Sequence, residues 1–261
     1  MNHFISVEGN YLIIHCGSRN LGLRVANYYQ DKAIAARDNR IRKIKDNAEI
    51  IIKDAASNGD YMGIAGVRFM RDEKIKAEPE NDLCYLEGED MQNYLHDMNM
   101  MRDWSFYNHK VIAQEIFDGM GWHDFPDALM THISSIHNYV DVERSIIRKG
   151  AIDMSDGKLG IIPLNMASGS LIVRGKGNQD YLCSGPHGAG RIMSRKKARL
   201  SVDMDDYHKI MSGIYTTSVC YDTLDEAPQA YKDADAIIDA IEPTADIIAH
   251  IRPRYNFKAK G

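Results

Sequence analysis

Glycines divide the stretch from residue 146 to residue 184 into short apolar runs, and this division is the strongest constraint on the fold. The runs KLGIIPLN, GSLIVRGKGN and DYLCSG have the length and composition of strands separated by turns. Two other stretches repeat their apolar residues with a helical period, from Leu21 to about Ile52 and from Met91 to Phe117. This combination predicts the α+β class, with mixed β-sheets and flanking helices.

The remaining segments complete this prediction. Residues 2–15 indicate two strands around a Glu-Gly-Asn turn. Residues 55–80 are polar and irregular, so we expect no regular element there. We expect a helix with an extension over residues 190–211 and a closing helix, bounded by proline, over residues 233–257. The chain has no internal repeat and no low-complexity tract, so we expect one α+β domain over residues 1–261.

The composition argues against several classes of protein. With 261 residues, 44% of them apolar, the chain can bury a sizeable core. Its net charge of −5 argues against general binding of nucleic acid, so a polyanion would need a local basic patch. The four cysteines form no CxxC pair, no signal peptide is evident, and no apolar run is long enough to span a bilayer. These features predict a reduced, cytoplasmic protein without a membrane partner, and we expect a monomer.

Four of the ten histidines stand at the ends of apolar or strand-like runs, beside glycine, cysteine or asparagine. They are His3, His15, His137 and His187. Strand ends present side chains to a cleft, and neutral imidazoles at several strand ends suit a metal ion. The alternative for each residue is a hydrogen-bonded core or loop histidine. The spacing between them is long, so no short metal-binding motif applies.

His187 differs from the other three because it lies within the glycine-rich stretch CSGPHGAGRIMSR. Glycines let the backbone approach a ligand closely and expose N–H groups to an anion. Arg191 and Arg195 add positive charge, and the start of the following helix favours phosphate. A neutral imidazole among phosphate-binding groups can attack phosphorus without a separate base. The alternative interpretation is a glycine-rich turn before a helix.

Two further basic segments each allow two interpretations. Arg19, in the loop CGSRNLG, could hold a phosphate through two hydrogen bonds, or could be a solvated side chain in a plain strand-to-helix turn. The segment RIMSRKKAR could contact a phosphate backbone, or could be the solvated face of a helix. The loop RGKGN favours a hairpin turn.

Together these residues resemble the RtcB family of RNA ligases, which are GTP-dependent enzymes of tRNA splicing and RNA repair. The resemblance runs in family order from residue 2 to residue 261 and is closest to a shorter bacterial branch. It rests on the motifs NHF, HCGSRNLG, HNY, RKGA, IIPLNM with GSLI, GKGN, PHGAGRIMSR, EAPQAYK and KAKG. It implies an RtcB-like fold that joins an RNA 2′,3′-cyclic phosphate or 3′-phosphate end to a 5′-hydroxyl end, using GTP and Mn²⁺.

The resemblance also implies roles for individual residues. His187 would be the nucleophile that becomes guanylylated, and His15 and His137 would share one manganese ion while His3 binds the other. Tyr231 would pack on the guanine and Lys260 would read its edge, while phosphates of RNA or nucleotide would be held by Arg19, Arg191 and Arg195. The full set that would bind GTP is Asn2, His137, Asn138, Pro163, Leu164, Asn165, Met166, Ser170, His187, Gly188, Ala189, Gly190, Tyr231 and Lys260.

The sequence departs from the family at its beginning. The family has an earlier segment with an Asp-x-x-Cys metal pair, which is not found here, and Ser6 stands at the position of a family glutamate, with Glu8 two residues later. Three histidines divided between two ions leave both metal sites under-coordinated. We therefore expect an N-terminally incomplete fold.

Three explanations for this departure compete. The chain is a fragment of a ligase, or one half of a split enzyme completed by a separate N-terminal segment, or a relative that binds GTP or RNA without ligating. A small metal-dependent phosphohydrolase built on the same histidines is an alternative from another functional class.

Overall fold

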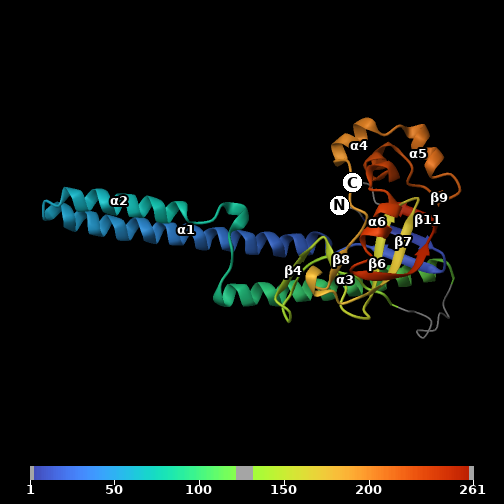
Figure 1. Cartoon of the computed structure of the whole chain (residues 1–261), viewed down its shortest axis with the longest axis horizontal. Coiled ribbons are helices and arrows are strands. Elements are labelled where there is room, and N and C mark those ends of the chain that lie inside the picture. Colours follow the sequence, from blue (N-terminus) through green and yellow to red (C-terminus); the bar gives the residue numbers. More distant parts are fainter. Residues whose placement is uncertain (1–2, 122–131, 259–261) are drawn as a thin grey trace. The chain divides into compact units, whose positions relative to one another are not determined.

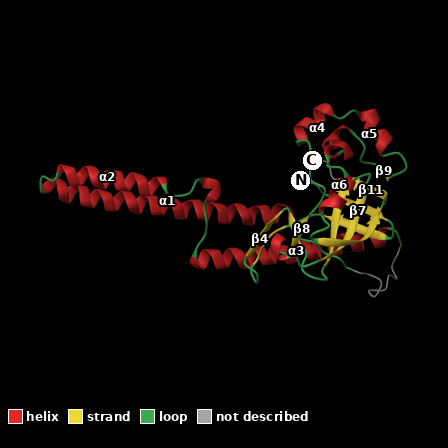
Figure 2. Ribbon diagram, in the orientation of Figure 1, coloured by secondary structure: helices red, strands yellow, loops and turns green. Residues whose placement is uncertain are grey.

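The structure, a computed structural model, describes residues 3–121 and 132–258 (Figure 1). Its contacts divide the chain into two compact units. Unit 1 consists of residues 1–17 and 105–261, and unit 2 of residues 18–104. Every strand belongs to unit 1, whereas unit 2 is built of helices (Figure 2). The expected single ligase domain over residues 1–261 stays a prediction, because compact units and functional domains need not coincide.

Unit 2 contains α1 (Arg19–Ser57), α2 (Tyr61–Lys76), η1 (Asn81–Leu83) and the first part of α3 (Gly88–Gly119). The two helices predicted from apolar periodicity are therefore confirmed. The expectation of an irregular segment over residues 55–80 is wrong, because α2 lies there and packs along α1. Asp60 begins this helix, since its carboxylate accepts a hydrogen bond of 2.8 Å from the backbone N–H of Gly63.

Unit 1 holds the mixed sheets. The order of strands is β2-β1-β11-β9 in one sheet and β10-β7-β6 in another, and β3-β4 and β5-β8 form two-stranded pairs. The strands are β1 (Phe4–Glu8), β2 (Tyr11–His15), β3 (Asn138–Asp141), β4 (Ile146–Lys149), β5 (Ala151–Asp153), β6 (Leu159–Asn165), β7 (Gly169–Gly175), β8 (Ser184–Pro186), β9 (Tyr215–Thr216), β10 (Ala245–Ile251) and β11 (Pro253–Lys258). The expected β1–β2 hairpin and α+β class are confirmed.

Short helices connect or follow these strands. They are η3 (Gln179–Tyr181), α4 (Arg195–Ser201), α5 (Met204–Ile210), η4 (Tyr221–Glu226), η5 (Pro228–Ala230) and α6 (Ala234–Ala240). The helix expected over residues 190–211 is two helices, because Asp203 caps a new one and accepts hydrogen bonds from two backbone N–H groups. No helix among the residues placed in the structure is long and apolar enough to cross a membrane.

The expectation of a closing helix over residues 233–257 is wrong for most of that segment. After α6, Pro243 prevents a helix from continuing, and the chain forms β10 and β11 instead. β10 pairs with β7, and β11 pairs with β1, so that Lys258 lies opposite Phe4. In Figure 1 the C-terminal strands are red and lie among strands of other colours. The end of the chain thus completes both larger sheets.

β7 lies at the centre of the core because both of its faces are buried. On one face Leu171 and Val173 pack with Ile162 of β6 and Ile241, which follows α6. On the other face Ile172 packs with apolar residues of β1, β2 and β10. This arrangement explains why GSLIVRG is a nearly continuous apolar run rather than an alternating one. The strands on both sides of β7 are thereby held in fixed positions.

Candidate active site

Strand ends bring the predicted histidines of unit 1 together. His15 is the last residue of β2 and lies opposite Phe4, which directly follows His3. His137 directly precedes β3, and His187 directly follows β8. The ring of His137 lies 5.7 Å from the ring of His15 and 4.7 Å from the ring of His187, measured between ring centroids. The structure therefore places three of the four imidazoles next to one another, and His3 lies near enough to lower the pKa of His15.

Burial keeps two of these imidazoles neutral. Burial, with smaller contributions from His137, Lys258, His3 and His187, lowers the pKa of His15 to about 3. Burial also lowers the pKa of His137, with a smaller contribution from His187. Near neutral pH each of these rings therefore carries one proton and one nitrogen lone pair.

Gly150 connects His137 to His187 through its peptide groups. Its N–H donates to the backbone carbonyl of His137 at 2.8 Å and to Oδ1 of Asn138 at 2.9 Å. Its carbonyl oxygen lies 2.6 Å from Nδ1 of His187. A carbonyl can only accept a hydrogen bond, so Nδ1 of His187 carries a proton, and in the neutral form of the ring Nε2 carries the lone pair.

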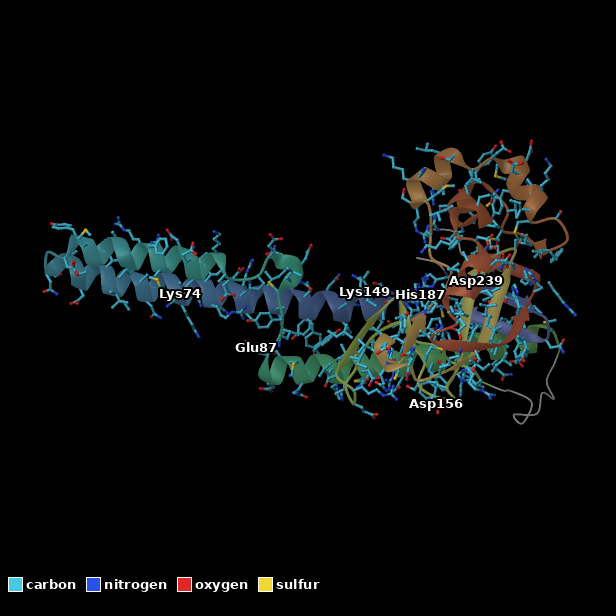
Figure 3. The ribbon with its side chains drawn as sticks, viewed as in Figure 1. Lys74, Glu87, Lys149, Asp156, His187 and Asp239 are labelled. Carbon is cyan, nitrogen blue, oxygen red and sulfur yellow. The ribbon has the colours of Figure 1, made fainter. Side chains whose placement is uncertain are left out.

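The position of Gly150 follows from the strand pairing around it. Asn138 lies opposite Lys149 in the β3–β4 pair, and Ala151 lies opposite Pro186 in the β5–β8 pair. Gly150 stands between the two pairs, directly after Lys149, which Figure 3 labels together with His187. Its φ of +68° is in the left-handed region, and a Cβ atom there would lie 3.3 Å from Cε1 of His187. Glycine is thus required for conformation and for space.

The predicted GTP-binding residues on β6 lie beside the His187 loop. The backbone N–H of Ala189 donates to the carbonyl of Pro163 at 3.2 Å, and Ser170 on β7 lies opposite Pro163. A Cβ atom on Gly188 would lie 3.0 Å from that same carbonyl. This close approach supports the expectation that the loop and the end of β6 form one region.

Several side chains of this predicted set point into the protein. Leu164, Met166 and Ala189 are buried in the core, so only their backbone groups could contact a ligand. Oδ1 of Asn165 accepts hydrogen bonds from two backbone N–H groups of the turn that follows β6. Asn2 and Lys260 lie outside the described residues, so their predicted contacts to GTP stay predictions.

The arginines that follow His187 contact buried carboxylates. Arg195 forms an ion pair with Glu226 at 2.7 Å and a second one with Asp225. Arg191 donates to the hydroxyl of Tyr231 at 3.3 Å, and that hydroxyl donates to Glu226 at 2.5 Å. Their predicted phosphate contacts stay predictions, and a phosphate would compete with these carboxylates. Arg19 is an exposed residue at the start of α1 in unit 2.

A buried lysine beside this network, Lys258, was not predicted from the sequence. Nζ of Lys258 lies 3.2 Å from Oε2 of Glu226 and 4.8 Å from the centre of the Phe4 ring. Burial lowers the pKa of Lys258, while the charge of Glu226 opposes that change. The alternation of side chains along β11 is the signal that could have found this residue, and it was missed because the segment resembled a helix.

Glu8 is a second buried ionisable group, whose burial was not predicted from the sequence. It lies on the same face of β1 as Ser6, whose hydroxyl donates to Oε1 of Glu8 at 2.7 Å. Burial raises the pKa of Glu8, although hydrogen bonds from Ser6 and Ser170 act to lower it. The departure from the family pattern at residue 6 therefore leaves a carboxyl group on the same face of the strand.

The described residues do not form a complete metal site. No group of three or more histidine, cysteine or acidic side chains within residues 3–121 and 132–258 is arranged to hold a metal ion. The rings of His15 and His137 are stacked with only 15° between their planes. Lone pairs lie in the ring planes, so stacked imidazoles do not direct them toward one point. Neutral imidazoles suit a metal chemically, but their arrangement here does not provide its full set of ligands.

Comparisons with known proteins agree with the motifs. The family model described as tRNA-splicing ligase RtcB matches residues 4–259. The RNA-splicing ligase RtcB of Escherichia coli strain K12 is 27% identical over 270 residues, which is 96% of this chain and 58% of the relative. The tRNA-splicing ligase RtcB of Aeropyrum pernix is 27% identical over 94% of this chain and 52% of its own length. The chain therefore spans little more than half the length of these curated relatives.

Proposed function

Since this chain belongs to the RtcB family, we propose that it acts in RNA ligation. It would join an RNA 3′-phosphate or 2′,3′-cyclic phosphate end to a 5′-hydroxyl end, with GTP and Mn²⁺, through a histidine–GMP intermediate on His187. The observation that supports this most is the 2.6 Å hydrogen bond between Nδ1 of His187 and the carbonyl of Gly150. In the neutral form of the ring this bond leaves the Nε2 lone pair available for attack on phosphorus.

The proposed reaction needs only simple chemistry from His187. Its Nε2 lone pair forms a bond to the α-phosphorus of GTP, and pyrophosphate leaves with the electrons of the broken P–O bond. An oxygen of the RNA 3′-phosphate then takes the GMP group, and the P–N bond breaks. The RNA 5′-hydroxyl finally bonds to the activated 3′-phosphate, its proton goes to water, and GMP leaves with the electrons of the broken P–O bond. A 2′,3′-cyclic phosphate end must first add water to give the 3′-phosphate. No separate base is required for the first step, because the attacking nitrogen carries no proton.

The other residues would position the phosphates of GTP and neutralise their charge. The glycine-rich backbone from residue 188 to residue 190 and the end of β6 would cradle the phosphates. A metal ion supplies charge neutralisation in chemistry of this kind. We assign no step to manganese, because the described residues do not form a complete site for it.

The incomplete metal site favours a second candidate, which is a protein that binds GTP or RNA without ligating by itself. A separate N-terminal segment would then have to complete the metal site. We also propose that the protein works in the cytoplasm, which fits four cysteines that form no disulfide, and that it is a monomer.

Transfer of label from GTP to the protein tests the proposal. The chain is incubated with Mn²⁺ and GTP that is labelled on the α-phosphate, alone and together with the N-terminal part of an RtcB relative. His187→Gln should lose the label, whereas His250→Gln should keep it, because His250 lies on β10 and bonds to the Ser168 carbonyl instead. Absence of label on the unchanged protein in both conditions would refute the ligase proposal. Retained binding of GTP or RNA in that case would support the second candidate.

A further inference from the structure

Arg148 is an arginine of β4 whose guanidinium is almost completely buried, with 1% of its side chain exposed. Buried charges occur in proteins only where partners compensate them. The guanidinium has partners on several strands. They are the hydroxyl of Tyr139 at 3.1 Å, Oδ2 of Asp141 at 2.8 Å, Oδ1 of Asp153 at 3.6 Å, the carbonyl of Leu182 at 3.5 Å and the hydroxyl of Ser184 at 3.0 Å.

Four of the five partners of Arg148 lie on the three strands that carry the His187 arrangement. Tyr139 and Asp141 belong to β3, which begins directly after His137. Asp153 belongs to β5, which begins directly after Gly150, and Ser184 belongs to β8, which leads into His187. The guanidinium of Arg148 therefore connects β3, β5 and β8, and the ends of these strands position His137, Gly150 and His187.

The turn before β8 requires such support. Leu182 and Cys183 have φ angles of 51° and 47°, in the left-handed region where residues other than glycine are strained. Strain of this kind persists only where surrounding contacts impose it. Arg148 donates to the carbonyl of Leu182, and the backbone N–H of Met154 donates to the carbonyl of Cys183 at 2.7 Å. Both contacts fix the path by which the chain enters β8.

We propose that Arg148 is a positioning residue for His187. It holds β3, β5 and β8 together, keeps the Gly150 carbonyl against Nδ1 of His187, and so sets the tautomer in which Nε2 is unprotonated. The planar fork of arginine suits this task, because it reaches acceptors in several directions at once, which the single ammonium group of lysine cannot do. The positioning rests on contacts alone, and only its consequence for catalysis rests on the proposed function.

The experiment measures the tautomer of His187 by NMR on the full chain with isotope-labelled histidine, assigned with His187→Gln. Arg148→Lys keeps the positive charge beside Asp141 and Asp153 but loses the fork. Arg144→Lys is the matched control, because Arg144 also pairs with both aspartates and, within the described residues, donates no hydrogen bond to β8. We expect the Nδ1–H tautomer in the unchanged protein and in the control. In Arg148→Lys the ratio of tautomers should shift by about fivefold or more, which corresponds to loss of one net hydrogen bond.

An unchanged His187 tautomer in folded Arg148→Lys would overturn the proposal. If that variant does not fold, Ser184→Ala decides, since it removes the bond from Arg148 to β8 together with the bond from the Ser184 hydroxyl to the Leu182 carbonyl, and both hold the start of β8. A shift in the same direction supports the proposal, and no shift overturns it. Labelling with GTP separates this result from the proposed function. If the unchanged protein is not labelled, the ligase proposal fails while the tautomer result stands. If it is labelled, Arg148→Lys should slow labelling at saturating GTP and leave the half-saturating GTP concentration unchanged.

Discussion

Replacing Gly150 with alanine should separate the two reasons for a glycine at that position. The first reason is conformational, because a residue with a Cβ atom at a φ of +68° costs about 1–2 kcal/mol of stability. The second is steric, because the new Cβ atom would lie 3.3 Å from Cε1 and 3.4 Å from Nδ1 of His187. Such contacts push the imidazole away by a few tenths of an ångström and weaken its hydrogen bond to the Gly150 carbonyl, which is worth about 0.5–1.5 kcal/mol net.

Gly157→Ala provides the matched control for this change. Gly157 has a φ of +74°, and a Cβ atom there would meet no atom within 4 Å. Both variants lose the same freedom in the unfolded chain, so that contribution cancels between them. Urea unfolding should therefore show a loss of about 1–2 kcal/mol for Gly157→Ala and up to about 1.5 kcal/mol more for Gly150→Ala.

The functional readouts should differ more than the stabilities. Gly150→Ala should shift the His187 tautomer and slow labelling by GTP, whereas Gly157→Ala should leave both unchanged. If the two variants are equally stable and His187 has the same tautomer in both, the deduction that the Gly150 carbonyl sets the state of His187 is wrong.

Further predictions concern the buried ionisable groups and unit 2. Lys258→Met should cost about 2–3 kcal/mol in urea unfolding, because the Glu226 carboxylate loses a charged hydrogen-bond partner; adding Glu226→Gln should recover part of the loss, and no recovery would contradict this explanation. Burial raises the pKa of Glu8 above its ordinary value of 4.5, so the folded state holds its proton more tightly and stability should fall as the pH rises from 4.5 through the raised value. Glu8→Gln should lessen that fall in the free energy of unfolding, and the exposed Glu242→Gln should not. Equal pH profiles of stability for the unchanged protein and Glu8→Gln would refute the raised pKa of Glu8. Tyr29→Phe removes the 2.7 Å hydrogen bond to Asp97 in unit 2 and should destabilise the protein by about 1 kcal/mol in urea unfolding. NMR should show that the His187 tautomer is unchanged in this variant.

Local signals predicted much of this protein correctly. The β1–β2 hairpin follows from two short apolar runs around Glu-Gly-Asn, and the long helices follow from a helical period of apolar residues. α2 was missed although Asp60 is a recognisable capping residue and half of the residues in Tyr61–Lys76 are apolar. The histidines at strand ends could likewise be selected from sequence, because a residue next to a turn is visible without knowledge of the fold.

The sequence by itself determined the α+β class, the family and the four histidines, since each depends on residues close together in the chain or on motifs in order. Only the tertiary structure decided that β11 pairs with β1, which places Lys258 beside Glu226, and that the Gly150 carbonyl faces His187. Strand pairing between distant segments depends on the packing of both faces of β7, and local preferences do not contain that information. For the same reason only the tertiary structure showed that Arg148, the first residue of the motif RKGA, is buried among four strands.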